Sequence, residues 1–233
     1  MGLVGIELGL ACAAASAVTK IIPFKKGTVP FFLQPVVIIR VGGVQPVILS
    51  SRRFMEDSPL IDEVLDRYRQ ALGPHYARYR GHVYRVYHYT RHLIAQQGND
   101  ADRDDSAIAV AAAFHDLRFA TEQTLDYLPP SIASATEHLD SLGLSEVAPA
   151  VGRMIGFHHK LTPYRDEDAA LVEPFRRADL VDLFAVPGVG VPFALRREAQ
   201  SSYPKCGFRG FVCRTLFIGA LKQPWRPLPM LRW

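Results

Sequence analysis

Helical periodicity runs through almost the whole chain after residue 55 and restricts what the chain can fold into. Ser58 and Pro59 have the residue types of a helix N-cap and a first helical position, and PLIDEVLDRYRQAL continues at helical spacing. No alternating strand pattern occurs after residue 55, so the sequence predicts an all-α domain. Further helices are expected at about 75–97, 105–119, 130–142, 145–160, 167–185 and 208–222, each ended by glycine, proline or a polar break.

Residues 1–54 have a different character. The first twenty residues are apolar but include Glu7 and lack a basic n-region. They are therefore a weak candidate for a signal peptide and are short for a membrane-spanning helix. The stretch FFLQPVVIIRVGGVQPVILSS is β-branched and broken by proline, and its VGG could turn a hairpin. We expect an irregular or partly β extension over 1–54 that is not part of the functional domain at 55–233, with Met55 as a candidate translation start. The alternative is a genuine extension that contacts a membrane or docks on the domain.

Charge is unevenly distributed along the chain. The net charge of +4 divides into +3 for residues 1–50, −5 for 51–203 and +6 for 204–233. An acidic central region argues against nucleic acid as a specific partner, because nucleic-acid-binding domains carry a basic stripe on the folded domain itself. We therefore interpret the basic ends as solubilising charge.

The cysteine content bears on the compartment. The chain has three cysteines, an odd number, and they form no CxxC pair. A disulfide framework is therefore not expected, and we expect a reducing compartment and a cytoplasmic protein.

The first candidate metal ligand is a histidine in the segment 75–97. His82 lies on an apolar stripe at helical spacing, whereas His88 and His92 lie with Arg85 on the opposite side. We expect His82 to face the core and the other two histidines to face water. A lone histidine on such a stripe is more often a hydrogen-bonded core residue than a ligand, so it needs partners elsewhere.

The motif AFHDLRF places His115 and Asp116 side by side in an alanine-rich run. His115 shares the core stripe of its helix, and Asp116 lies one step round. A buried charge needs a partner, and a metal ion is one of the few that suits histidine and carboxylate together.

A second carboxylate lies on the core stripe of EPFRRADLVDLF. This residue is Asp179, with Asp182 near the same face as the reserve choice. The alternative is a structural carboxylate paired with Arg176 or Arg177. Two imidazoles and two carboxylates form an N₂O₂ ligand set that suits Zn, Mn, Fe, Co, Ni or Mg. The sequence therefore predicts one divalent ion held by His82, His115, Asp116 and Asp179.

The order His, His-Asp, Asp resembles the HD-domain superfamily of metal-dependent phosphohydrolases. The resemblance covers about residues 58–190 and is carried by YRGHVYRV, AFHDLRF, MIGFHHK and RRADLVDLF. The segments LDYLPPS and PLPMLRW are also similar to those of small bacterial HD proteins, distantly similar to fungal cyanamide hydratases. The resemblance implies an HD-type helical bundle with His82, His115, Asp116 and Asp179 as the metal ligands.

One residue departs from the family pattern. Many HD proteins have glycine two residues after the HD pair, and this chain has Arg118. We expect the substitution to change the loop shape and the substrate access beside the metal.

Candidate catalytic residues accompany the ligands. A metal-bound hydroxide would attack the substrate, with Asp116 at the metal and Asp126 orienting the water or taking its proton. For Asp126 the alternative is a turn or N-cap residue. Only one of His158 and His159 should point towards the metal. That histidine would stabilise the negative charge that develops during the reaction without itself binding the ion. Lys160 could hold a phosphate together with Arg165, unless both are solvated surface charges.

The sequence thus predicts a hydrolase, most simply a phosphohydrolase of a small phosphate ester or nucleotide. The alternatives are a hydratase or lyase of the cyanamide-hydratase type, in which the same hydroxide adds to an uncharged carbon, and a non-catalytic metal-stabilised binding module. Cationic side chains beside the metal would favour the first, and an apolar closed pocket the second.

Overall fold

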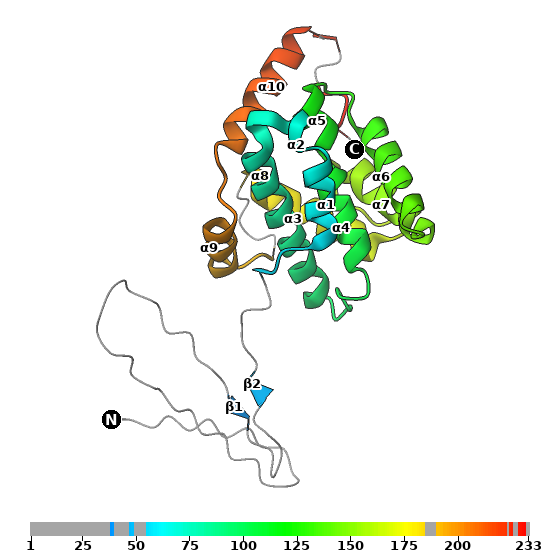
Figure 1. Ribbon diagram of the computed structural model, residues 1–233, viewed down its shortest axis with the longest axis vertical. Helices are drawn as coiled ribbons and strands as arrows, with labels where there is room; N and C mark the ends of the chain where they lie inside the picture. Colours follow the sequence, from blue (N-terminus) through cyan, green and yellow to red (C-terminus); the bar gives the residue numbers. More distant parts are fainter. Residues whose placement is uncertain are drawn as a thin grey trace, which may run out of the picture. The chain divides into compact units, whose positions relative to one another are not determined.

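The structure is a computed structural model that describes residues 55–184, 190–222, 224–225 and 228–231, together with two short strands nearer the N-terminus (Figure 1). The chain divides into two units, Met1–Phe54 and Met55–Trp233. In the first unit, β1 (Ile38–Ile39) pairs antiparallel with β2 (Val47–Ile48). The apolar run at residues 1–20 and the VGG segment lie outside the described residues.

The second unit is all-α throughout its described residues, as the sequence predicts. Two 3₁₀ turns, η2 at Gly73–His75 and η3 at Ser145–Val147, connect neighbouring helices. The helices are α1 (Pro59–Arg67), α2 (Arg69–Leu72), α3 (Tyr76–Gln96), α4 (Asp105–Phe114), α5 (Leu117–Glu122), α6 (Leu128–Ser141), α7 (Ala148–Phe157), α8 (Ala169–Phe184), α9 (Phe193–Ser202) and α10 (Phe208–Lys222). None of these helices is long and apolar enough to cross a membrane.

Helix α3 lies at the centre of the unit and packs against α4, α8, α9 and α10 (Figure 1). Its middle is buried on every side, and Arg85 and His88 are only 0% and 5% exposed. The expectation that His88 faces water is therefore wrong, and Arg85 on the same side is buried as well, whereas His92 is partly exposed. A helix surrounded by other helices has no solvent face, so its polar side chains must find partners inside the protein.

Two helices end earlier than the sequence pattern indicates. The segment expected as one helix at 105–119 is interrupted at His115 and Asp116, so that Asp116 is the N-cap residue of α5. Helix α7 ends at Phe157, which leaves His158 and His159 in the turn that follows. Both interruptions fall at residues that the sequence singles out for chemistry.

The remaining boundaries show how far periodicity predicts helices. Ser58 and Pro59 occupy the predicted N-cap and first position of α1, although the Ser58 side chain makes no capping hydrogen bond. Helix α10 has the predicted bounds. Helix α9 was not expected, because it is mostly exposed and buries only Ala199.

Candidate metal centre

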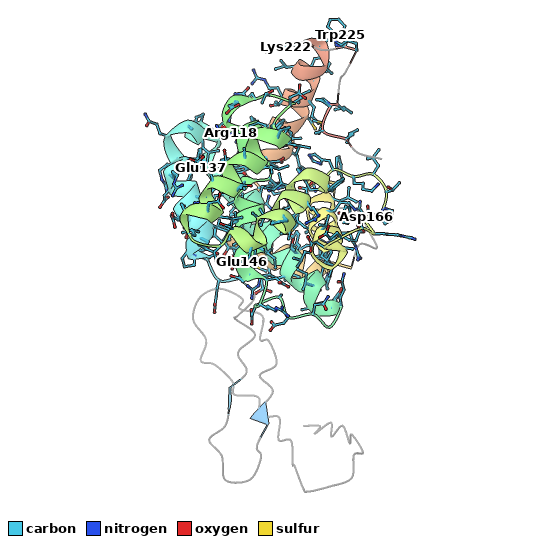
Figure 2. All side chains as sticks on the ribbon, turned by 90° about the vertical axis from the view of Figure 1, so that its right-hand side faces the viewer. Arg118, Glu137, Glu146, Asp166, Lys222 and Trp225 are labelled. Carbon is cyan, nitrogen blue, oxygen red and sulfur yellow. The ribbon has the colours of Figure 1, made fainter. Side chains whose placement is uncertain are left out.

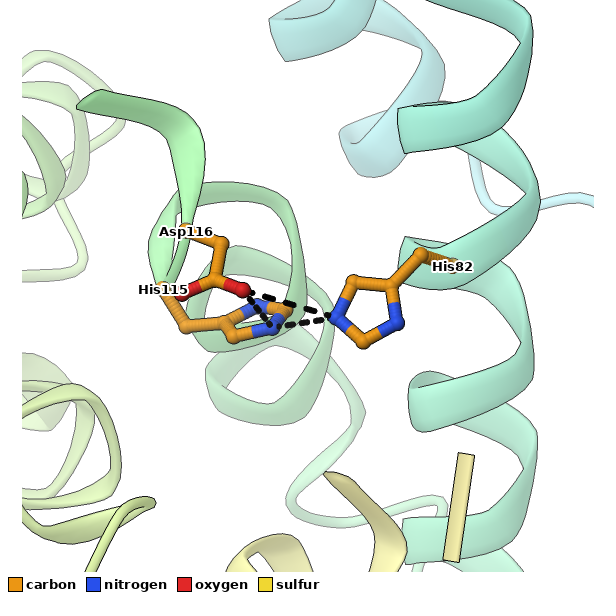
Figure 3. Close-up of side chains that lie close together, drawn as sticks. All are labelled: His82, His115 and Asp116. Carbon is orange, nitrogen blue, oxygen red and sulfur yellow. Dashed lines mark hydrogen bonds and ion pairs between the residues drawn. The ribbon is translucent and has the colours of Figure 1, made fainter. Parts of the chain in front are cut away.

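Four side chains from three parts of the fold meet in the middle of the second unit. His82 comes from α3, His115 and Asp116 from the junction of α4 and α5, and Asp179 from α8. Figure 3 shows the first three converging, with ring and carboxylate atoms directed at one another. All four residues are at most 3% exposed, so the sequence-predicted ligands form one buried group.

The distances within this group resemble those in a metal coordination shell. The Nε2 atom of His82 lies 2.9 Å from Nε2 of His115, 3.4 Å from Oδ1 of Asp179 and 3.8 Å from Oδ2 of Asp116. The Nε2 atom of His115 lies 3.7 Å from the same Asp116 oxygen and 3.9 Å from the same Asp179 oxygen. With metal–ligand bonds of about 2.1 Å, neighbouring ligand atoms stand roughly 3.0–3.4 Å apart. The group is therefore slightly wider than a closed shell. His82, His115 and Asp116 have ligand atoms within 4.8 Å of one another and could hold a metal ion. Asp179 adjoins these three residues through its contacts with the two histidines.

Hydrogen bonds behind the two imidazoles orient them for ligation. The Nδ1 atom of His115 donates to the backbone carbonyl of Ala112 at 2.8 Å. The Nδ1 atom of His82 lies 2.8 Å from a carboxylate oxygen of Asp182, which can only accept. With both protons on Nδ1, each Nε2 presents a lone pair towards the other, an arrangement that repels unless a cation lies between them.

Unpartnered polar atoms in the same place fit a bound cation. Oδ1 of Asp116 and Oδ1 of Asp179 are buried without a hydrogen-bond partner among the described residues. Leaving such an atom unpaired costs about 1–3 kcal/mol. A divalent ion would satisfy the carboxylate oxygens.

Burial changes the acidity of these groups. It raises the pKa of Asp179 to about 7 and lowers the pKa of His115 to about 3. Burial alone would also raise the pKa of Asp116, but His115 and His158 outweigh it and hold that pKa well below its usual range. Near neutral pH, His115 is therefore uncharged and ready to ligate, while Asp179 still binds a proton part of the time.

Metal affinity should consequently depend on pH through Asp179. A proton on this carboxyl group, whose pKa without metal is about 7, competes with the ion. We expect the affinity to rise about tenfold per pH unit between roughly pH 5.5 and 7 and to level off above pH 7, as for one competing proton. Calorimetric titrations across this range measure the slope, and a pH-independent affinity would contradict Asp179 as a ligand.

Asp182, the reserve ligand, has a different position from the one expected. It lies behind His82 and receives two hydrogen bonds from the Arg85 guanidinium, at 2.6 and 2.8 Å. Burial would raise the pKa of Asp182, but Arg85 and His82 outweigh it and keep the carboxylate ionised. Arg85 also donates to the carbonyl of Tyr203 at 2.6 Å. This buried chain of charges fixes the ring of His82, as carboxylates behind metal-bound histidines do.

The alternative for Asp179 was an ion pair with Arg176 or Arg177. Arg176 forms its ion pair with Glu173 at 2.8 Å. Asp179 has carboxylate–imidazole contacts with His82, His115 and His159.

The turn after α7 brings two further histidines to the group. Nε2 of His158 lies 3.4 Å from Oδ1 of Asp116, and Nδ1 of His159 lies 3.7 Å from Oδ2 of Asp179. The expectation that only one of them points inward is wrong, because α7 ends before His158 and helical geometry no longer separates the two side chains. Asp116, His158 and His159 form a second group whose ligand atoms lie within 4.8 Å of one another.

Sequence reasoning missed Tyr127 at this site. Its ring is 1% exposed, and its hydroxyl lies 2.7 Å from Nε2 of His159. Burial raises the pKa of Tyr127 well above its usual value, so the hydroxyl stays protonated and acts as the donor. The apolar residues around Tyr127 in LDYLPPS are the sequence signal that indicates its burial.

The other candidate catalytic and substrate-binding residues lie outside the buried metal-ligand cluster. Asp126 is exposed, two residues before α6. Lys160 is half-buried, and its Nζ donates to Thr162 at 2.7 Å. Arg165 is exposed. The structure therefore brings His158 to the buried cluster but leaves Asp126 at the surface and Lys160 bonded within its own turn.

Arg118, the departure from the HD pattern, is held on the outside of the unit. Its guanidinium bonds Glu122 at 2.8 Å and the Ser134 hydroxyl at 2.7 Å. Figure 2 shows Arg118 near the surface of the helical unit. In this conformation its charge is directed to α6 rather than to the ligands.

Aromatic rings enclose the ligands. The Phe208 ring stacks on His82 with centroids 4.1 Å apart, and Phe175 meets His115 edge-on at 5.6 Å.

Comparisons with models of known families, with curated proteins and with solved structures find no match to this chain.

Proposed function

We propose that the protein is a metal-dependent hydrolase of the HD type. The observation that carries the proposal is the buried N₂O₂ group of His82, His115, Asp116 and Asp179, with both imidazoles oriented from behind and two carboxylate oxygens unpartnered. Structural metal sites close all their positions with protein ligands. Four ligands leave room on a five- or six-coordinate ion, which favours a reactive role over a purely structural one.

A divalent ion held here would supply Lewis acidity, lowering the pKa of a coordinated water and neutralising charge on a substrate oxygen. The protein's own residues would accept and transfer the proton that the coordinated water loses. His158 donates from Nδ1 to the carbonyl of Ile155 at 2.7 Å, which leaves its Nε2 directed at Asp116. Burial would lower the pKa of His158, but the Asp116 carboxylate outweighs it and raises that pKa. Nε2 of His158 is thus suited to hold a proton beside the reacting position.

A path for that proton leads outward through the neighbouring histidine. The rings of His158 and His159 lie 3.9 Å apart by centroid, and His159 hydrogen-bonds the Tyr127 hydroxyl. The side chain of His159 is 18% exposed, whereas that of His158 is fully buried. We propose that His159 exchanges protons with solvent and that Tyr127 positions it.

The first proposed substrate class is a small phosphate ester or nucleotide, since hard oxygen and imidazole ligands suit ions that polarise phosphoryl oxygens. One observation favours the second class, addition of water to a nitrile-like carbon. The rings of Phe208 and Phe175 lie against the ligands, and the nearby cation Arg85 is already paired with Asp182. An enclosed aromatic surround of this kind suits an uncharged substrate.

The test uses purified full-length protein, stripped with a chelator and reloaded with Mn²⁺, Co²⁺ or Ni²⁺. It is assayed against a panel of phosphate esters and a panel of small nitriles. We expect chelation to abolish turnover of one panel and metal to restore it, by at least about a hundredfold, because the ion generates the nucleophile. Turnover that survives complete chelation would overturn the proposal.

A further inference from the structure

The outer face of α10 is apolar and uncovered among the described residues. Phe217 and Leu221, one helical turn apart, are 66% and 67% exposed, and Ile218 between them is 37% exposed. Trp225, just beyond the helix, is 86% exposed. We call these four residues the α10 apolar face. Soluble monomers seldom expose so many large apolar side chains in one place without a binding role.

The packing of the opposite side fixes which side of α10 is exposed. Phe208, Phe211 and Thr215 are buried, and Gly219 lies so close to Leu125 that an added Cβ would stand 2.4 Å from that side chain. Helix α10 therefore cannot rotate to bury its apolar face without losing these contacts. In Figures 1 and 2 the helix projects from the rest of its unit, with Lys222 and Trp225 at its outer end.

Charge around the face indicates what it contacts. Residues 204–233 contain six basic residues and no acidic residue. Arg214 lies one turn before Phe217 and Lys222 directly follows Leu221, and both are exposed. Aromatic and aliphatic side chains flanked by Lys and Arg, with a Trp at the margin, are typical of elements that lie in the interface of an anionic membrane.

We propose that the α10 apolar face docks on the surface of an anionic lipid bilayer, with Phe217, Leu221 and Trp225 inserted at the headgroup level and Arg214 and Lys222 against the lipid phosphates. A second copy fits less well, because a symmetric contact would bring Arg214 and Lys222 close to the same basic residues of the other copy. Residues 1–50 carry a net charge of +3, so the amino-terminal segment has the same sign as the face. A nucleic acid would match the charge but would leave the aliphatic side chains uncovered.

The test is co-sedimentation of the full chain with vesicles. One set is pure phosphatidylcholine, and the other contains about 30 mol% phosphatidylglycerol. We expect binding to the anionic set, with a blue shift of the tryptophan emission, to which Trp225 contributes as it leaves water; the other tryptophan is Trp233. Phe217→Ser together with Leu221→Ser should weaken the binding more than tenfold. Arg214→Gln and Lys222→Gln should each weaken it about fivefold, as expected for one charge near a membrane.

Phe193→Ser is the matched control, because Phe193 is 70% exposed on a different helix, α9. It should bind vesicles like the unaltered protein. Equal binding of the Phe217/Leu221 double variant would overturn the proposal and assign lipid contact to another segment. The proposal also fails if the protein binds the neutral and the anionic vesicles equally well. It fails as well if the double variant instead dissociates a dimer, or if the face binds a nucleic acid but no vesicle.

Discussion

Replacing Asp116 by Ala should remove stoichiometric metal binding and at least about 99% of any metal-dependent activity. Asp116 offers Oδ2 to the group of His82 and His115, while its Oδ1 lies near His158. Its loss therefore removes a ligand and also the carboxylate that raises the pKa of His158. Elemental analysis of the purified variant, together with activity at saturating metal, measures both effects.

Thermal unfolding gives a second measure of the same substitution. A ligand present at 100 times its Kd stabilises the native state by about 2.7 kcal/mol, which is about 5–10 °C for a domain of this size. Unaltered protein should show this increase on adding metal, and Asp116→Ala should show almost none. Asp166→Ala, at an exposed position, is the control and should respond like the unaltered protein (Figure 2). A fully metal-loaded Asp116→Ala protein would show that the ligands are assigned wrongly.

Replacing Asp182 by Ala should have the largest effect on stability. The substitution leaves the Arg85 guanidinium, which is fully buried, without its carboxylate. Removing one partner of a buried ion pair typically costs 3–5 kcal/mol. It also frees the His82 ring, and losing a carboxylate behind a metal-bound histidine typically weakens metal affinity by about 10–100-fold. Denaturant unfolding and metal titration measure the two losses separately.

The conservative change Asp182→Asn keeps the size and shape of the side chain but removes its negative charge. The amide can keep one hydrogen bond to Arg85 but supplies no negative charge, so we expect intermediate stability and reduced metal affinity. Exposed Asp66, which pairs with Arg69 at the surface, offers a matched comparison: Asp66→Ala should change stability little, since exposed pairs contribute about 0–1 kcal/mol. A loss for Asp182→Ala no larger than that of Asp66→Ala would contradict the role of this buried pair.

Much of the candidate site could be predicted from helical periodicity. A stripe analysis is enough to place His82, His115 and Asp179 on buried faces, because each interrupts an apolar stripe that must pack inward. The same reasoning recovers the all-α class and the bounds of α10. Polar residues on such stripes need partners, and the four ligands meet because their helices share one core.

Other features could not be predicted because they depend on tertiary packing. Nothing in the local sequence indicates that α3 is surrounded on all sides, so its stripe pattern puts Arg85 and His88 on the side away from the core, although both are buried. The helix end at Phe114 has no glycine or proline beside it. At Phe157 the neighbouring glycine, Gly156, lies inside the helix and not after its end, so it does not mark the boundary. As a result, the joint approach of His158 and His159 and the contact with Tyr127 emerge only in the folded chain.

The claim that His82, His115, Asp116 and Asp179 bind a divalent ion is tested most directly by Co²⁺ titration of chelator-treated full-length protein. Cobalt bound to nitrogen and oxygen ligands at low coordination number absorbs visible light far more strongly than the hydrated ion. We predict that this absorption grows until one equivalent of cobalt is bound and then stops. A spectrum that remains that of hydrated Co²⁺ at every ratio, together with no cobalt retained by the protein in equilibrium dialysis, would contradict the metal centre and the hydrolase proposed from it.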